Sequence, residues 1–400
     1  GLGIPAEPLF RSASRCINMS VCNIPNCSTV ERYAFCSCYA LADLGSFCPT
    51  VIGGFAFSHC FSLSTICLSR CVAIGEDAFN SCSSLASISL ASECVVGAHA
   101  FAQCSGLTRV SFDSVAWIGS GTFANCRSLS EFPFDKLSSI TDSMFVGCGF
   151  VSVNLGSLSY LGRYAFSYCQ SLQCAILPSC NIINQGAFYN CASLASIDAP
   201  LCSLVEYSAF CRCTSLIDIS LPICECVSGY AFASAGLEEI SLPQCLRIGD
   251  YAFSSTRLTR AFFPMCSSIG SRAFNECRSL SLIDLRDCEY IGSYAFAWCY
   301  SLADISIPHC QEIGYNAFRS CTSLSIISLP ACSYILDYAF ALCTALTSVY
   351  LIGSSVASIR DSTAFYSTPL LVSSYTGSFG SIYVPASLYS DYVSRWPTTS

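Results

Sequence analysis

The stretch I-G-S-Y-A-F-A-W-C-Y-S-L-A-D-I-S-I-P-H-C, residues 291–310, decides the fold, because the chain repeats it with small changes. The phenylalanine of its A-F pair recurs every 22 residues, with three steps of 21 and a last step of 25. It lies at Phe35, Phe57, Phe79, Phe101, Phe123, Phe145, Phe166, Phe188, Phe210, Phe232, Phe253, Phe274, Phe296, Phe318, Phe340 and Phe365. About 16 repeats therefore cover roughly residues 24–371. A period this short is typical of a solenoid, in which each repeat packs mainly against its neighbours.

Each repeat reads I-G-x-x-A-F-x-x-C-x-S-L-x-x-I-x-L-P-x-C. The L-x-x-I-x-L part, as in Leu85, Ile88 and Leu90, ends in apolar–polar alternation, which predicts a short strand with one buried face. We interpret I-G as a turn and A-F-x-x-C as a helical or 3₁₀ turn on the back of the coil. In the three 21-residue coils, which start at Phe145, Phe232 and Phe253, we expect the missing residue between the phenylalanine turn and the strand.

Composition excludes several classes of protein. The 400 residues are only 11% charged and carry a net charge of −8. Nucleic-acid binding needs clustered cations, but Lys136 is the single lysine and the arginines are spread along the chain. No run of 18 apolar residues occurs, so the sequence predicts no membrane span. The opening G-L-G-I-P-A-E-P-L-F lacks the features of an export signal, so we expect a mature form or a cut piece.

The repeat resembles the BspA-like class of leucine-rich repeats over almost the whole chain. The ending S-I-Y-V-P-A-S-L-Y-S-D-Y-V-S-R-W (381–396) also resembles the tail that follows such arrays in gut bacterial proteins. The resemblance implies a surface or secreted binding protein, often an adhesin, of gut bacteria or anaerobic parasites. It implies no catalytic residues. We expect an α/β repeat solenoid, a right-handed leucine-rich-repeat coil with a parallel sheet on one face and short helical or 3₁₀ turns on the other. The expected domains are a cap segment at 1–23, the solenoid at 24–371 and a cap or tail at 372–400.

Most of the 32 cysteines fall on two ladders of the repeat. The first lies three residues after the phenylalanine and the second about eight before it; Ala235, Val115 and Leu137 fill some of the gaps. Free cysteine behaves as a small buried hydrophobe, so reduced, buried ladders are the favoured interpretation and partial disulfide pairing is the alternative. The thiols expected to be unpaired, buried and free of metal are Cys82, Cys191, Cys288, Cys299, Cys310 and Cys321.

Two further expectations concern individual cysteines. Cys299→Ala should cost about 1 kcal/mol of stability, and Cys299→Ser should cost more, because its hydroxyl would need a partner. A disulfide between Cys16 and Cys22, ahead of the first coil, is an open alternative.

The sequence predicts no enzyme, no metal site and no cofactor. The three histidines, His59, His99 and His309, lie at three different phases of the repeat. No cysteine or serine is therefore paired with a recurrent histidine, as an activated nucleophile requires.

The candidate binding face consists of the outward positions of the predicted strands, where acids outnumber cations. It contains Asp198, Asp218, Glu239, Arg260, Phe262, Asp284, Asp304 and Tyr350. The ordinary interpretation is a solvated polar face, and the sharper one is a shallow surface for a basic protein or a glycan. Aromatic residues usually carry interface energy, so the end with Phe262 and Tyr350 is favoured.

A second candidate surface is a tyrosine row two residues before the phenylalanine. Its members are Tyr33, Tyr164, Tyr230, Tyr251, Tyr294 and Tyr338. The simpler interpretation of this row is packing between coils with the hydroxyl groups in water.

The sequence therefore predicts an extracellular or cell-surface binding or adhesion protein with a protein or glycan ligand. The alternative is a self-associating subunit of a fibre, appendage or phage tail.

Overall fold

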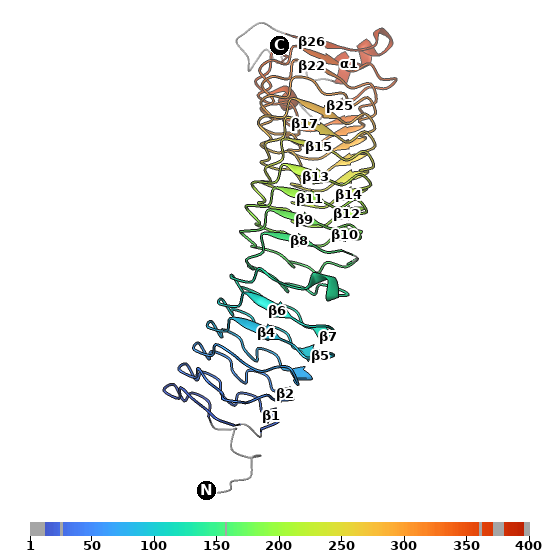
Figure 1. The fold of residues 1–400 in the computed structure, drawn as a ribbon. Helices are drawn as coiled ribbons and strands as arrows, with labels where there is room; N and C mark the ends of the chain where they lie inside the picture. Colours follow the sequence, from blue (N-terminus) through green and yellow to red (C-terminus); the bar gives the residue numbers. More distant parts are fainter. Residues whose placement is uncertain (1–12, 25–26, 157, 360–361, 371–379, 396–400) are drawn as a thin grey trace, which may run out of the picture. The chain divides into compact units, whose positions relative to one another are not determined.

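The computed structural model describes residues 13–24, 27–156, 158–359, 362–370 and 380–395. The chain forms successive coils joined by parallel strands (Figure 1). Contacts divide it into two compact units, Gly1–Cys180 with Ala187–Leu194 and Asn181–Gly186 with Ala195–Ser400, called here the first and the second unit. Helix is rare, as expected for a solenoid of short coils.

The strands predicted from L-x-x-I-x-L form one series, called here the motif strands. In the first unit they are β4 (Ser87–Ser89), β6 (Arg109–Ser111), β8 (Ser152–Asn154) and β9 (Cys174–Ile176). In the second unit they are β11 (Ser196–Asp198), β13 (Asp218–Ser220), β15 (Glu239–Ser241), β17 (Arg260–Phe262), β19 (Leu282–Asp284), β22 (Ile326–Ser328), β24 (Ser348–Tyr350) and β26 (Ser381–Tyr383). Each pairs in parallel with a neighbouring coil, as in β15 with β17 and β17 with β19.

A second series of strands precedes each I-G glycine, where the sequence predicted only a turn. In the first unit it contains β1 (Thr29–Val30), β2 (Val51–Ile52), β3 (Ala73–Ile74), β5 (Cys94–Val96) and β7 (Val115–Ile118). In the second unit it contains β10 (Ile182–Ile183), β12 (Leu204–Val205), β14 (Cys226–Val227), β16 (Arg247–Ile248), β18 (Ser268–Ile269), β20 (Tyr290–Ile291), β21 (Glu312–Ile313), β23 (Tyr334–Ile335) and β25 (Ser358–Ile359). Most of these strands have only two residues, too few for alternation to show in the sequence.

The back of most coils is a succession of turns rather than a 3₁₀ helix, and the last coil, whose Phe365 lies in a 3₁₀ helix, is an exception. The N–H groups of Tyr294, Phe296 and Trp298 donate to carbonyls of the next coil at 2.7–2.9 Å. Those of Ala295 and Ala297 close turns within their own coil at 3.1–3.2 Å. Tyr294 and Trp298 have φ of 57° and 63°, the left-handed conformation that such turns require at one position. Because alternate N–H groups bond between coils, no continuous helix can form.

The phenylalanines of the A-F pairs form a buried stack inside each unit. Phe296 is fully buried, and its ring centroid lies 5.2 Å from those of Phe274 and Phe318 with nearly parallel planes. In the first unit, Phe79 and Phe101 stack at 5.1 Å. Each ring adds a large buried apolar area to that of the leucine and isoleucine side chains of its coil.

Strand pairing confirms where the 21-residue coils lose a residue. Glu239 pairs with Arg260, and Arg260 pairs with Leu282. Counted in the sequence, the first two lie seven residues after their phenylalanine, whereas Leu282 lies eight after Phe274. Ser152, the first residue of β8, also lies seven residues after Phe145. The deletion therefore precedes the strand, as predicted, and the register of the sheet is kept.

One coil of the first unit is irregular. Between the bridge residues Glu131 and Ile140 it contains the 3₁₀ helix η2 (Phe134–Lys136), and Phe132 and Phe134 pack edge-on against Phe145 at 4.8 and 5.5 Å.

The C-terminal tail closes the second unit with further structure. It contains η3 (Ser362–Phe365), β26, η5 (Ala386–Leu388) and the short helix α1 (Tyr389–Arg395). β26 pairs with β24, and the N–H of Ala357 donates to the hydroxyl of Tyr392 at 3.0 Å. Residues 1–12 of the expected N-terminal cap, and 372–379 and 396–400 of the expected tail, lie outside the described residues.

The ladder cysteines are hydrogen-bond donors as well as buried side chains. In the first ladder the thiol donates to the phenylalanine carbonyl of the preceding coil, as in Cys299 to Phe274 at 3.1 Å. Cys82, Cys191 and Cys321 do the same at 3.0–3.2 Å. In the second ladder the thiol donates to the carbonyl two residues on, as in Cys288 at 3.3 Å and Cys310 at 3.4 Å. All six cysteines are buried, and none is disulfide-bonded.

Burial makes these thiols weak acids. It raises the pKa of Cys299, Cys82 and Cys321 well above the ordinary value, and that of Cys288 to about 12. A thiol that stays protonated is a poor nucleophile and a poor metal ligand. This chemistry agrees with a structural role for the ladders.

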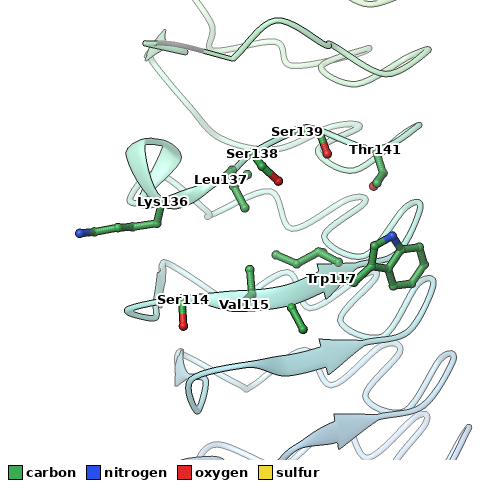
Figure 2. A pocket seen from close by; sticks show the side chains of 10 residues that line it. Ser114, Val115, Trp117, Lys136, Leu137, Ser138, Ser139 and Thr141 are labelled. Atoms are coloured by element: carbon green, nitrogen blue, oxygen red, sulfur yellow. The ribbon is translucent and has the colours of Figure 1, made fainter.

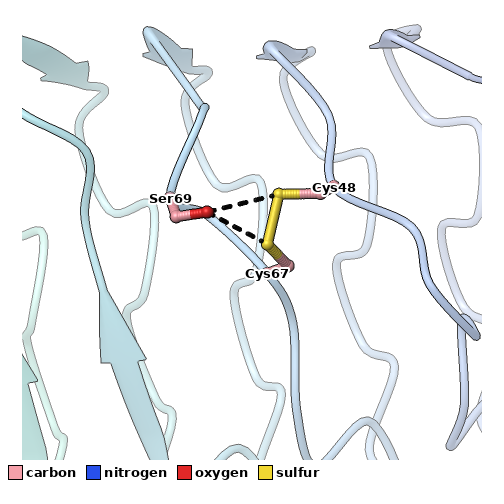
Figure 3. The surroundings of a disulfide bond; sticks show 3 residues. All are labelled: Cys48, Cys67 and Ser69. Carbon is pink, nitrogen blue, oxygen red and sulfur yellow. Dashed lines mark hydrogen bonds between the residues drawn. A yellow bond between two sulfur atoms is a disulfide. The ribbon is translucent and has the colours of Figure 1, made fainter.

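A single disulfide, between Cys48 and Cys67, is present in the described part of the chain (Figure 3). Their Cα atoms are 4.9 Å apart, and the Ser69 hydroxyl lies 3.3–3.5 Å from both sulfur atoms. Cys48 belongs to the second ladder by phase, whereas Cys67 lies off both ladders. Partial pairing is therefore observed, but Cys16 and Cys22 are each free.

Candidate functional site

The candidate site is the outward face of the motif strands in the second unit. In β15 the side chains of Glu239 and Ser241 point outward on either side of Ile240, which is buried. The same alternation in every motif strand gives two rows of outward side chains, each with one residue per coil. Figure 1 shows these strands stacked one above another from β11 to β26.

Seven of the eight predicted residues lie at outward positions of motif strands, and Asp304 lies two residues before Ser306, which bridges Asp284 and Ser328. Asp198, Asp218, Glu239, Arg260 and Asp304 are exposed, whereas Phe262, Asp284 and Tyr350 are half-buried.

Two of the acids on this face are paired with arginines. Glu239 lies 3.9 Å from Arg260, and both side chains are largely exposed, so this pair adds little stability. Asp284 binds Arg286 through two hydrogen bonds, of 2.5 and 3.1 Å, and this bonding lowers the pKa of Asp284. Arg286 was not among the predicted residues.

Elsewhere on the face, negative charge is left unbalanced. Within the described residues, neither Asp218 nor Asp304 forms an ion pair. Ligand-accessible negative charge is therefore concentrated at these two acids and Asp198.

The two predicted aromatic residues do not meet. Phe262 is opposite Asp284 in the pairing register, whereas Tyr350 is opposite Ser328. Tyr350 instead stacks on Tyr383 of the tail strand β26, with ring centroids 4.5 Å apart. The apolar–polar alternation of S-I-Y-V in the tail was the only sequence signal for this partner.

The face is also more apolar than the sequence suggested. Leu282 and Ile326 occupy outward positions and are 47% and 49% exposed. A ligand for this surface would therefore meet both acidic and apolar groups.

A separate small hollow of about 190 Å³ lies at the irregular coil of the first unit (Figure 2). Trp117, which is 51% exposed, lies at one side, and Ser138, Ser139 and Thr141 lie across from it. Figure 2 shows Lys136 pointing away from Trp117. The replacement of ladder cysteines by Val115 and Leu137 was the sequence signal for this irregularity.

The described residues contain neither a metal-binding group nor a membrane-spanning helix. No group of three histidine, cysteine or acidic residues there is arranged to hold a metal ion. No helix in that part of the chain has the length and apolar character needed to cross a membrane.

Comparison with known proteins identifies the repeat. The family model described as "BspA type Leucine rich repeat region" matches in six overlapping copies, at residues 10–130, 50–173, 95–216, 138–259, 181–288 and 267–386. A leucine-rich repeat protein from Bacteroides ovatus has a similar structure, with 24% identity and a TM-score of 0.66 over 79% of this chain and 88% of that one. A leucine-rich cell surface protein from Faecalibacterium prausnitzii is 25% identical with a TM-score of 0.46, over 72% and 84%. No curated protein matches the chain.

Proposed function

We propose that this chain, which belongs to the BspA-type leucine-rich repeat family, is a non-enzymatic binding protein of the cell surface or the extracellular space. Its ligand is a protein or a glycan, bound by the outward face of the motif strands in the second unit. A stacked sheet suits this function, because it holds side chains at fixed spacing on a rigid backbone.

The composition of that face carries the proposal. Asp198, Asp218 and Asp304 are exposed there, beside half-buried aromatic rings at Phe262 and Tyr350. Aromatic side chains that keep part of their surface exposed are frequent anchors of interfaces, and charged groups around them set specificity. The alternative of a self-associating fibre subunit finds no comparable support.

Ligand binding by a charge-removed variant tests the proposal. The purified chain is screened against a panel of extracellular proteins and glycans, together with a variant carrying Asp198→Asn, Asp218→Asn, Asp304→Asn and Tyr350→Ala. We expect the variant to lose binding about tenfold or more, the scale of one strong interface residue.

A matched control removes the same charge elsewhere. Asp113, Glu225 and Asp287 are exposed acids outside the motif strands, and their conversion to amides should leave binding unchanged. If both variants bind like the unmodified chain, the motif-strand face is not the binding site.

A further inference from the structure

A continuous line of side chains follows the back turns of the second unit and is called here the aromatic row. Its members, in order, are Tyr207, Tyr230, Tyr251, Arg272, Tyr294, Tyr315, Tyr338 and Tyr366. Adjacent tyrosine rings have centroids between 4.5 and 6.2 Å apart. This segment of each coil is distinct from the motif strands, so the inference goes beyond the proposed function.

The backbone of the back turns explains why the row is continuous. Tyr230, Tyr251, Tyr294 and Tyr338 lie two residues before their phenylalanine and have φ between 57° and 59°. Since each coil repeats this conformation, side chains of equal phase lie one coil apart. Four coils have no aromatic residue at this phase: one has Arg272 there, the last has Tyr366 directly after its phenylalanine, and in the other two the preceding residue supplies the ring. These two residues are Tyr207 and Tyr315, which keep contact with the row.

One member shows which chemical group the row accepts. Arg272 occupies the phase of the tyrosines, and its guanidinium lies 5.4 Å from the ring centroid of Tyr251 and 4.8 Å from that of Tyr294. It also donates to the Tyr251 hydroxyl. A guanidinium between two aromatic faces is a cation–π arrangement, favoured because the ring face carries partial negative charge. A guanidinium therefore takes the place of one ring in the row and contacts the rings on both sides.

The first unit repeats this arrangement independently. The rings of Tyr33 and Phe55 stack at 4.9 Å, and the guanidinium of Arg32 lies 5.1 Å from each ring centroid. Both rings have the same phase as the tyrosines of the row. Two separate places thus show that rings at this phase receive guanidinium groups.

Carboxylates accompany the row along its length. Glu206, Asp250 and Asp337 each precede a tyrosine of the row directly. Glu312 lies in β21, and with Asp250 it adds to the burial effect that raises the pKa of Tyr290 in the neighbouring β20. Arg212, Arg247, Arg272 and Arg319 match these four acids in number, and Arg319 bonds Asn316 at the phase of the row. The contribution of Glu206 and Asp250 is therefore local, as carboxylates that can pair with a cationic group placed over the neighbouring rings.

The rings of the row are accessible, and there is space beside them. Tyr207 and Tyr366 are each 47% exposed, and Tyr315 is 38% exposed. A hollow of about 360 Å³ adjoins the first half of the row, with Gly229, Gly249 and Gly270 in its lining. Gly249 and Gly270 are needed there for coil packing, since a Cβ on either would meet the backbone of the preceding coil at 2.6–2.7 Å.

We propose that the aromatic row binds an extended, arginine-containing segment of another protein, with guanidinium groups over the tyrosine rings and the flanking carboxylates pairing with them. An extended chain rises about 3.3 Å per residue, so side chains on one side recur every roughly 6.6 Å. This repeat is close to the 5.7–6.2 Å between rings in the C-terminal half of the row. Arginine at alternate positions is the pattern that fits.

Labelled octapeptides test the chemistry of the ligand on the whole chain. One alternates arginine and serine, a second has citrulline for arginine, a third has lysine, and a fourth has the same arginines in one block. By fluorescence anisotropy we expect the alternating arginine peptide to bind about tenfold more tightly than the citrulline peptide, which is planar but uncharged. The lysine and block peptides should be weaker by a few-fold, since only arginine stacks as a planar cation and only alternation matches the rings.

Substitutions in the aromatic row test whether the arginine peptide binds there. The double variant Tyr315→Ala with Tyr338→Ala should weaken the arginine peptide about tenfold, the product of two exposed cation–π contacts. The double variant Tyr315→Phe with Tyr338→Phe keeps the ring faces and should bind within about twofold of the unmodified chain. A matched control, Tyr160→Ala with Tyr334→Ala, removes two exposed tyrosines outside the row and should change nothing.

Replacing Arg272 should strengthen peptide binding, whereas the tyrosine-to-alanine substitutions should weaken it. Arg272→Ala removes a cation and opens the space between Tyr251 and Tyr294, so the arginine peptide should bind a few-fold more tightly. Equal binding of arginine and citrulline peptides overturns the proposal. Three other results would also overturn it. They are weaker peptide binding by the Arg272→Ala variant, binding of glycans but of none of the four peptides, and self-association of this chain as the only interaction of the row.

Discussion

The two units share a core and differ at their surfaces. Both contain the phenylalanine stack, with Phe101 fully buried in the first unit and Phe296 in the second. Both also contain thiols that donate to the phenylalanine carbonyl of the preceding coil. Only the second unit extends its surface rings into a long row, whereas in the first unit Asp77 and His99 follow Phe55 at the same phase. Among the residues that the structure describes, the disulfide and the irregular coil belong to the first unit.

This difference shows which positions the repeat constrains. A buried position contacts the coils on both sides, so every copy must fill the same space. An outward position faces solvent and can vary from coil to coil. Surface features confined to one unit are therefore the better indicators of function, and features common to both units are indicators of stability.

The largest expected effect is common to both units and depends on pH. Burial raises the pKa of Cys104 and Cys169 in the first unit, and of Cys277 in the second, to about 12 from an ordinary value of 9.0. Between these values the unfolded chain loses thiol protons that the folded chain keeps, so stability is complete below pH 9 and falls as the pH rises toward 12. Each thiol should cost about 1.4 kcal/mol per pH unit in this window. Urea unfolding at pH 8 and pH 10 checks this, and equal stability at both would contradict the burial of the ladders.

Truncation of one ring in each unit tests whether the two cores are equivalent. Phe101→Ala and Phe296→Ala should each lower the free energy of unfolding by about 3–5 kcal/mol, because a fully buried ring leaves a cavity between its two stacked neighbours. Denaturant unfolding monitored by circular dichroism measures both. A loss below 1 kcal/mol in one unit alone would show that its stack is not a core.

Loss of the disulfide should destabilise the first unit and leave the second unit unchanged. Thiol titration of the denatured, unreduced protein should find 30 free thiols, because Cys48 and Cys67 are joined. The double variant Cys48→Ser with Cys67→Ser should destabilise the first unit by about 3 kcal/mol, as expected for closing a loop of this length. Hydrogen exchange of the second unit should not change. A titration of 32 thiols would refute the disulfide.

The smallest effect concerns one ladder thiol. From the sequence, serine at Cys299 was expected to cost more than alanine, but the structure provides the hydroxyl with an acceptor, the carbonyl of Phe274. Thr256, at the same phase, donates to the carbonyl of Phe253 at 2.8 Å. Cys299→Ser should therefore cost less than Cys299→Ala, for which about 1 kcal/mol is expected from the lost volume and hydrogen bond. Thermal unfolding of the two variants side by side decides the order.

The sequence by itself determined the repeat, the motif strands, the buried phenylalanine stack and the position of the missing residue in the 21-residue coils. These features depend on a pattern that every coil must satisfy, since each coil buries its apolar face only against its neighbours. The same pattern marked the positions of Asp218 and Arg260 as outward, because side chains in a strand alternate between its two faces.

Only the tertiary structure decided the features that depend on which residues of different coils come together. The second series of strands, at the I-G positions, has too few residues per strand for apolar–polar alternation to show in the sequence. Their hydrogen bonds form only when coils stack. The stacking of Tyr350 on Tyr383 and the insertion of Arg272 between Tyr251 and Tyr294 likewise depend on the register between coils. The thiol donors at Cys299 and Cys321 were missed for the same reason, since their acceptors belong to the preceding coil.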